Sequence, residues 1–234
     1  MNIIFYIILF LIGIGIGDFL AIQSIVLPRS LDMKKTFYNK KTNEELRSKI
    51  TYILIGGISS VIIGHILKLY EFDISNLIIY VFMMIYVSTL ISIAGIDKNY
   101  TKIDKRELAF GIISSIIYML YLAIIDLASI YVNAIYLLIY MIFLIIDCLL
   151  LRKCAKDSYI INTLLLLTII LVFTNINTLI CTVIMAIIAI LLYILILKIQ
   201  QKKNGNKKIK INQIPVGYFI SASNIIVLFL TRIC

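Results

Sequence analysis

The chain has 234 residues, of which 62% are hydrophobic and only 15% charged, and its formal net charge is +10. A water-soluble domain needs more polar surface than this, so the composition is typical of an integral membrane protein. The positive charge does not indicate nucleic-acid binding, because the Lys and Arg residues lie in short clusters between apolar runs, without a basic domain interleaved with aromatic residues. We therefore expect the lipid bilayer, and no nucleic acid, as a partner.

Apolar runs recur along the whole chain, and each is close to the roughly 20 helical residues that cross a hydrocarbon core about 30 Å thick. Lipid offers the backbone no hydrogen-bond partners, so these runs are expected to be helices. The sequence predicts an all-α, polytopic transmembrane bundle, a single membrane domain over residues 1–234. Its eight predicted spans are 3–26, 51–70, 75–96, 107–125, 128–150, 159–175, 177–198 and 214–231.

The Lys and Arg residues predict which way the bundle faces. All of them except Lys68 and Arg232 lie in or directly beside four loops. Positively charged loops stay in the cytoplasm, so these four are predicted to be cytoplasmic and both termini to be outside. The four loops are 27–50, 97–106, 151–158 and 199–213.

Glycines in the first span predict close helix packing. Gly13 and Gly17 are four residues apart and therefore share one face of the helix, where small residues let a neighbouring backbone approach. The single histidine, His65, is expected to have a structural role near the outer end of the second span. No cluster of His and Cys has metal-ligand spacing, so no metal site is predicted.

Acidic residues in or beside membrane spans are the candidates for chemistry, because placing a carboxylate there is costly. Asp18 lies within the first span, where it is expected to face a cavity or to bond to Asn162 or a serine. Asp97 and Asp157 lie at cytoplasmic boundaries, at the end of the third span and the start of the sixth. Two other acids, Asp126 and Asp147, lie at the ends of spans, and Asp147 is a candidate for a supporting role.

Asp97 and Asp157 could form a catalytic pair. The fourth and fifth spans cross the membrane out and back, so the chain returns Asp157 to the face at which Asp97 lies. Two carboxylates close together do not both ionise easily, and the pair then shares a proton. One carboxylate can activate a water for attack on a peptide carbonyl, while the other donates a proton to the carbonyl oxygen and later to the leaving amine.

A simpler interpretation of both aspartates remains open at this point. Each could be a solvated carboxylate at a helix end. Asp157 would then cap the sixth helix, and Asp97 would pair with Lys98 or Lys102.

Four segments of the chain resemble the bacterial type IV prepilin peptidases, the prepilin leader peptidases of the GxGD aspartic type. The run Gly-Ile-Gly-Ile-Gly-Asp-Phe-Leu-Ala at 13–21, followed by Leu-Pro-Arg at 27–29, is similar to the family's opening. Ile-Asp at 96–97 is similar to its first catalytic block, and Asp157, with Tyr159, Ile160 and Leu164 after it, stands in the place of its second. Ile-Pro-Val-Gly-Tyr-Phe at 214–219 is similar to the family's Ile-Pro-Phe-Gly-Pro-Phe before the last span.

The chain departs from the family pattern at three positions. Cys154 and Lys156 stand where the second catalytic block has its two glycines, and Asp104 stands where the family usually has a proline. A glycine permits a positive φ or a close backbone approach, so these changes affect how Asp157 is held. Residues 27–50 contain no cysteine and therefore lack the tetracysteine element that many members carry in this loop.

The resemblance implies a membrane aspartic endopeptidase with Asp97 and Asp157 as its catalytic residues. Its substrates would be prepilins or pseudopilins, whose basic leader is cut from an apolar helix at the cytoplasmic face of the bacterial inner membrane. The peptidase step needs no cofactor. The resemblance also implies that the new pilin terminus could be N-methylated with S-adenosylmethionine.

Two other functions remain open. A catalytically impaired relative that binds pilin-like helices is favoured by the altered glycine motif. A transporter is the rival from another class, but the spans have no paired breaks near the membrane midplane, and the acids gather at one boundary.

Overall fold

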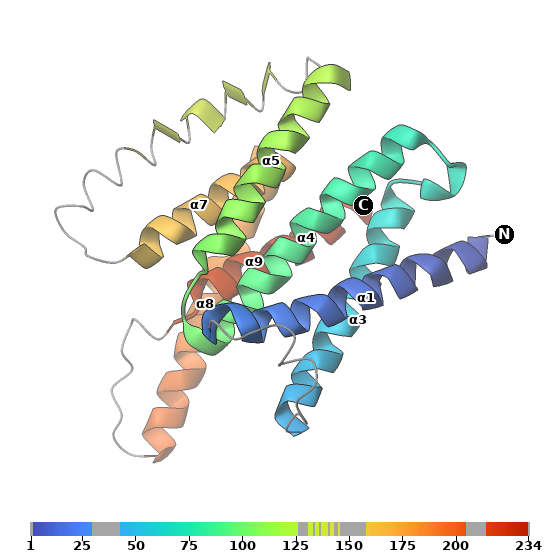
Figure 1. The fold of residues 1–234 in the computed structure, drawn as a ribbon. Helices are drawn as coiled ribbons and strands as arrows, with labels where there is room; N and C mark the ends of the chain where they lie inside the picture. Colours follow the sequence, from blue (N-terminus) through green and yellow to red (C-terminus); the bar gives the residue numbers. More distant parts are fainter. Residues whose placement is uncertain are drawn as a thin grey trace.

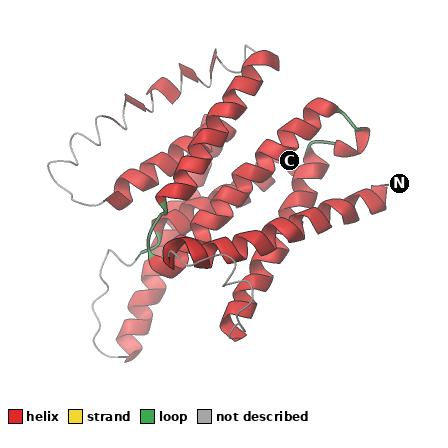
Figure 2. Cartoon of the chain, in the orientation of Figure 1, coloured by secondary structure: helices red, strands yellow, loops and turns green. Residues whose placement is uncertain are grey.

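The computed structural model describes residues 2–29, 43–125, 158–204 and 214–233, together with scattered helical residues between 131 and 145. Within these residues the regular structure is entirely helical, as Figure 2 shows. The helices are α1 (Asn2–Arg29), α3 (Asn43–Ile66), α4 (Ile74–Tyr100), α5 (Lys105–Ile125), α7 (Ser158–Phe173), α8 (Ile176–Asn204) and α9 (Val216–Ile233), with the short 3-10 helix η1 (Leu69–Glu71) between α3 and α4.

Seven of the eight predicted spans correspond to described helices. Five of these, α1, α3, α4, α5 and α8, are long and apolar enough to cross a membrane, whereas α7 and α9 are apolar but shorter. The remaining predicted span, 128–150, lies largely outside the described residues. The described part of the chain is therefore a helical bundle with several candidate membrane spans.

The ends of two helices differ from the prediction. The helix of the second span ends at Ile66, and the chain then turns through Lys68 and Phe72, which both have a positive φ. The helix of the third span continues to Tyr100, so Asp97 lies inside its last turn. Thr101 adopts a left-handed conformation and donates its N–H to the carbonyl of Asp97, which ends the helix there.

Helix α4 lies at the centre of the described bundle and packs against α1, α3, α5 and α9 (Figure 1). Its inward face includes Tyr86, Leu90 and Ile93, which are completely buried. The beginning of α1 lies near the turn that starts α4, since the rings of Phe5 and Phe72 are 6.2 Å apart. The end of α4 therefore lies at the opposite end of the bundle, which we call the Asp97 end.

Glycines bring α1 and α3 into close contact, as predicted from Gly13 and Gly17. A side chain added at Gly13 would come within 2.7 Å of the Gly57 Cα, and one at Gly17 within 2.7 Å of the Ile53 Cα. Gly15, between them, faces open space. The close approach of the two backbones therefore depends on glycine at positions 13 and 17.

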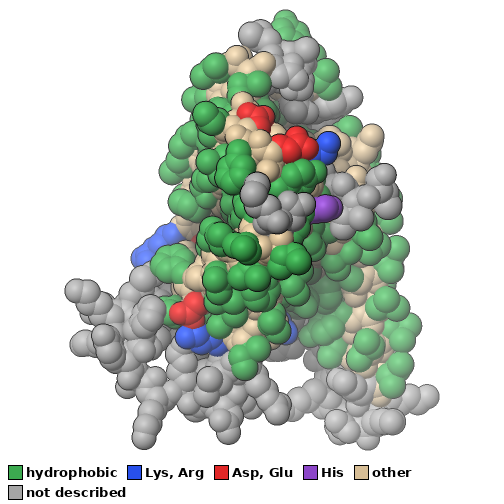
Figure 3. Space-filling view, turned by 90° about the vertical axis from the view of Figure 1, so that its right-hand side faces the viewer, with side chains coloured by type: hydrophobic (Ala, Val, Ile, Leu, Met, Phe, Trp, Pro, Cys, Tyr) green, Lys and Arg blue, Asp and Glu red, His purple; other side chains and the backbone are tan. Residues whose placement is uncertain are grey.

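The outer surface of the bundle is largely hydrophobic, and Figure 3 shows such side chains over most of one face. The interior contains polar links between helices. The Asn224 side chain on α9 accepts from the Tyr86 hydroxyl on α4 and donates to the Thr182 hydroxyl on α8. A buried asparagine with both partners present ties three helices together where water is absent.

Candidate functional site

Asp97 is the centre of a buried polar site at the Asp97 end of the bundle. It lies in the last turn of α4, and its side chain is 0% exposed. The tyrosine hydroxyl of Tyr159, in the first turn of α7, lies 2.9 Å from each of the two Asp97 carboxyl oxygens. The backbone N–H of Tyr218, in the first turn of α9, donates to Asp97 Oδ2 at 2.9 Å. Three helices that are distant in sequence therefore meet at one carboxyl group.

The start of α9 is shaped to approach this carboxyl group. The N–H of Gly217 donates to the Tyr159 hydroxyl at 3.2 Å, next to the bond from Tyr218 to Asp97. A Cβ at position 217 would lie 3.1 Å from Asp97 Oδ2 and 2.9 Å from Ile103 Cδ1. Glycine therefore allows the first N–H groups of α9, which have no partner within the helix, to reach the site.

The turn between α4 and α5 forms the floor of the site. Ile103 in this turn is fully buried, and its carbonyl accepts a bond from the Asn162 side chain of α7 at 3.0 Å. Asp104 accepts the N–H of Arg106 at 2.7 Å and so caps the start of α5. An aspartate can therefore begin α5 at the position where the resembled family usually has a proline.

A second buried carboxyl group lies at the start of α5. Glu107 is 3% exposed, and its side chain accepts a hydrogen bond from the Gln23 side chain of α1. This contact joins the end of α1 to the beginning of α5. Within the described residues, no group of three or more His, Cys, Asp or Glu side chains is arranged to hold a metal ion.

The structure tests several of the sequence expectations. The solvated alternative for Asp97 is wrong, because the side chain is enclosed and its described partners are Tyr159 and Tyr218 in place of Lys98 or Lys102. A carboxyl group at a helix end becomes buried when neighbouring helix starts supply its hydrogen bonds.

Asp18 also differs from the expectation. It forms an ion pair with Lys49 of α3 and bonds neither to Asn162 nor to a serine in the described structure. His65 accepts or donates a hydrogen bond with the Tyr6 hydroxyl at 2.8 Å, between α3 and α1, which fits its expected structural role. Three further predicted acids lie outside the described residues: Asp126, Asp147 and Asp157.

Sequence reasoning missed the residues that hold Asp97. Tyr159, Gly217 and Tyr218 belong to segments that carry the family resemblance, but the sequence alone assigned them no role. Glu107 and Gln23 were also missed, because Glu107 stands in a charged stretch that is typical of an exposed loop. The only indication of that contact in the sequence was Gln23, a polar residue close to the end of an apolar span.

Replacing Tyr159 with phenylalanine is expected to destabilise the fold by about 1–3 kcal/mol. The change removes one hydroxyl and leaves the buried Asp97 and the Gly217 N–H without that partner. Thermal unfolding in detergent measures the effect. Tyr193→Phe is the matched control, since the Tyr193 ring packs against Phe219 and its hydroxyl is not among the described hydrogen-bond partners of Asp97. Its change is expected to stay within about 0.5 kcal/mol. Equal stabilities for the two variants would contradict a structural role for the Tyr159 hydroxyl.

Comparisons of the chain with protein-family models, with curated proteins and with solved structures give no match. Function is therefore inferred from the residues of the site and from the four segments that resemble the prepilin peptidases.

Proposed function

We propose that this chain is a membrane aspartic endopeptidase that removes the basic leader from type IV prepilin-like substrates, with Asp97 and Asp157 as its catalytic pair. The observation that carries the proposal is the meeting of three separate segments at one carboxyl group. Asp97 comes from the first catalytic block of the resemblance, Tyr159 from the segment of the second, and Gly217 and Tyr218 from the segment before the last helix. Three segments that each resemble a block of the prepilin peptidases thus contribute residues to one site.

The position of Tyr159 supports Asp157 as the second member of the pair. Asp157 lies outside the described residues, but only Ser158 separates it from Tyr159 in the sequence. Two residues of chain extend at most about 7 Å between their backbones, and the hydroxyl at the end of the Tyr159 side chain is hydrogen-bonded to Asp97. Asp157 therefore adjoins a segment that contributes to the site, which supports the proposed encounter between the two aspartates in acid-base catalysis.

In the proposed reaction, the charged aspartate takes a proton from a water that attacks the scissile carbonyl carbon. The protonated aspartate donates its proton to the carbonyl oxygen, which gives a tetrahedral diol. As the C–N bond breaks, the aspartate that took the proton from water passes it to the leaving amine, and one diol hydroxyl returns its proton to the other aspartate. No metal is required by these steps. The described conformation is closed, since Asp97 is fully enclosed, so the starts of the helices around it have to move before a substrate reaches the carboxyl group.

The remaining features of the proposal follow from the charges and the resemblance. Basic residues flank the Asp97 end, so we assign this end to the cytoplasmic face of a bacterial inner membrane. Substrates would be prepilins or pseudopilins, with the leader in the cytoplasm and the apolar helix in the bilayer. N-methylation of the product with S-adenosylmethionine is supported by the resemblance alone.

A second candidate is a catalytically impaired relative that binds pilin-like helices without cutting them. Two observations favour it: the replacement of the motif glycines by Cys154 and Lys156, and the enclosure of Asp97. Both candidates use the same site and differ only in whether the peptide bond is broken.

Cleavage of a prepilin by the purified chain separates these candidates. The full-length protein, in detergent supplemented with lipid, is incubated with prepilin, and the mass of the product is measured. We expect a single cut that releases the basic leader. Intact prepilin that nevertheless co-purifies with the chain would overturn the peptidase proposal in favour of the binding relative, and the absence of both cleavage and binding would overturn both.

A further inference from the structure

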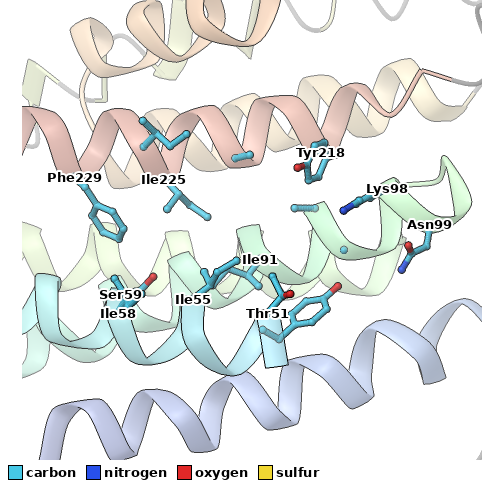
Figure 4. Close-up of a pocket in the computed structure, with 15 residues that line it drawn as sticks. Thr51, Ile55, Ile58, Ser59, Ile91, Lys98, Asn99, Tyr218, Ile225 and Phe229 are labelled. Atoms are coloured by element: carbon cyan, nitrogen blue, oxygen red, sulfur yellow. The ribbon is translucent and has the colours of Figure 1, made fainter. Parts of the chain in front are cut away.

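An apolar groove lies beside α4, lined by Ile91, Gly95 and Lys98 of this helix and not by Asp97. It has a volume of about 630 Å³ and runs between α3, α4 and α9 (Figure 4). Its walls are mainly apolar, with Ile55, Ile225 and Phe229 along its length, and small residues such as Ala222 leave room within it. In Figure 4, Lys98, Asn99 and Tyr218 lie at one end, and Phe229 lies at the other.

The length of the groove corresponds to one leaflet of a bilayer. The lining residues of α3 extend from Thr51 to Ser59, and those of α9 from Tyr218 to Phe229, which are helical rises of about 12 and 16 Å. One leaflet contributes about 15 Å to a hydrocarbon core of about 30 Å. The groove therefore reaches from the Asp97 end to about the middle of the membrane.

Beyond Phe229 the helices close together. The next cavity along α3 and α9, beside Ile63 and Leu228, holds only about 10 Å³. A transmembrane helix lying in the groove would have to continue across the full thickness of the membrane, whereas the described residues beside Ile63 and Leu228 are closely packed. An acyl chain of one lipid ends at mid-membrane, as the groove does.

The positive charge of Lys98 indicates which lipid headgroup fits the open end of the groove. Lys98 is exposed there, with its amino group 5.6 Å from the centre of the Tyr218 ring. Within the described part of the chain, no carboxylate forms an ion pair with Lys98. A cation at the membrane surface attracts anionic lipid headgroups. The side chains of Asn99 and Thr51 add hydrogen-bonding groups at the same end.

We propose that this groove binds one anionic phospholipid, with its phosphate at Lys98 and an acyl chain along α3 and α9. The polar and apolar parts of the groove are arranged in the order of a lipid molecule, from headgroup to chain end. Ser59 also lines the groove, and its hydroxyl is buried without a hydrogen-bond partner in the described structure. A helical serine can satisfy such a hydroxyl by turning it toward a carbonyl of its own preceding turn. The groove shares Tyr218 with the Asp97 site, and its occupancy is tested by lipid binding, without any measurement of peptidase activity.

Native mass spectrometry of the delipidated full-length chain tests the proposal. The probes are phosphatidylglycerol and phosphatidylcholine with identical acyl chains. The parent protein is expected to bind one phosphatidylglycerol about fivefold more tightly than phosphatidylcholine, the preference that one lysine near the membrane surface supplies. Lys98→Gln is expected to remove this preference, and Lys98→Arg to retain it.

Two further variants make the test specific to the groove. Ala222→Phe fills the groove and is expected to abolish tight binding of both lipids, with thermal unfolding as the check on its fold. Lys102→Gln, an exposed lysine that does not line the groove, is the matched control and is expected to keep the parent's preference. Should Ala222→Phe unfold, the comparison of Lys98→Gln with Lys102→Gln decides the question.

The proposal is overturned if Lys98→Gln keeps the lipid preference, or if a folded Ala222→Phe binds lipid as the parent does. It is also overturned if a synthetic transmembrane peptide binds with a dependence on Ala222 while neither lipid does, because the groove would then be a helix-docking site.

Discussion

Asp97→Asn is expected to lower the rate of leader cleavage by about 10²–10⁴-fold, the usual contribution of a catalytic acid or base. The variant is expected to fold normally. The asparagine amide oxygen can accept the Tyr218 N–H, as Asp97 Oδ2 does, and the amide nitrogen can donate to the Tyr159 hydroxyl. The substitution therefore removes the proton-transfer group and keeps a hydrogen bond from position 97 to each of Tyr159 and Tyr218, with the direction of the Tyr159 bond reversed.

Asp157→Asn is expected to produce a loss of the same size, and the double variant a loss no larger than either single one. Groups that act as a unit in one step do not give additive losses. Initial rates of prepilin cleavage under matched conditions measure all three variants, and thermal unfolding in detergent confirms that each is folded.

Asp73→Asn is the matched control for these variants. Asp73 caps the start of α4 at the opposite end of the bundle, where it accepts the Ser75 N–H at 3.1 Å. Its replacement is expected to leave the cleavage rate within about twofold of the parent. Surface changes of this kind alter the free energy of unfolding by no more than about 0.5 kcal/mol, so the protein stays folded. Full activity in a folded Asp97→Asn protein, or losses that multiply in the double variant, would show that the two aspartates are not a catalytic pair.

Gly17→Leu is expected to destabilise the bundle by about 3 kcal/mol, the upper end of what overpacking typically costs. A Cβ at this position meets the backbone of α3, within 2.7 Å of the Ile53 Cα. Backbone cannot rotate away as a side-chain end can, so α1 and α3 have to separate. Thermal or detergent-induced unfolding of the purified protein measures the loss.

Gly15→Leu is the control for this prediction, because it makes the same substitution two residues away in the same helix. No atom lies within 4 Å of a Cβ at position 15, which is exposed on the outer surface. Its stability is expected to stay within about 0.5 kcal/mol of the parent. Equal losses at positions 15 and 17 would show that the contact between α1 and α3 does not set the cost.

The sequence predicted the helical class and most of the candidate spans, because lipid leaves the backbone few alternatives to a helix. It also indicated the face of α1 that packs closely, since Gly13 and Gly17 have helical spacing and small size. Helix ends were harder to predict. Asp97 was expected to end its span, but α4 continues to Tyr100 because a left-handed Thr101 closes the last turn.

By itself, the sequence determined that the described chain forms apolar helices and that Asp97 lies close to the end of one of them. Only the tertiary structure decided the environment of that group. Whether a carboxylate at a helix end is solvated or buried depends on which other helices begin beside it, and such contacts join residues far apart in the chain. Here the starts of α7 and α9 bring Tyr159 and Tyr218 to Asp97, so a side chain expected to meet water is instead enclosed and hydrogen-bonded.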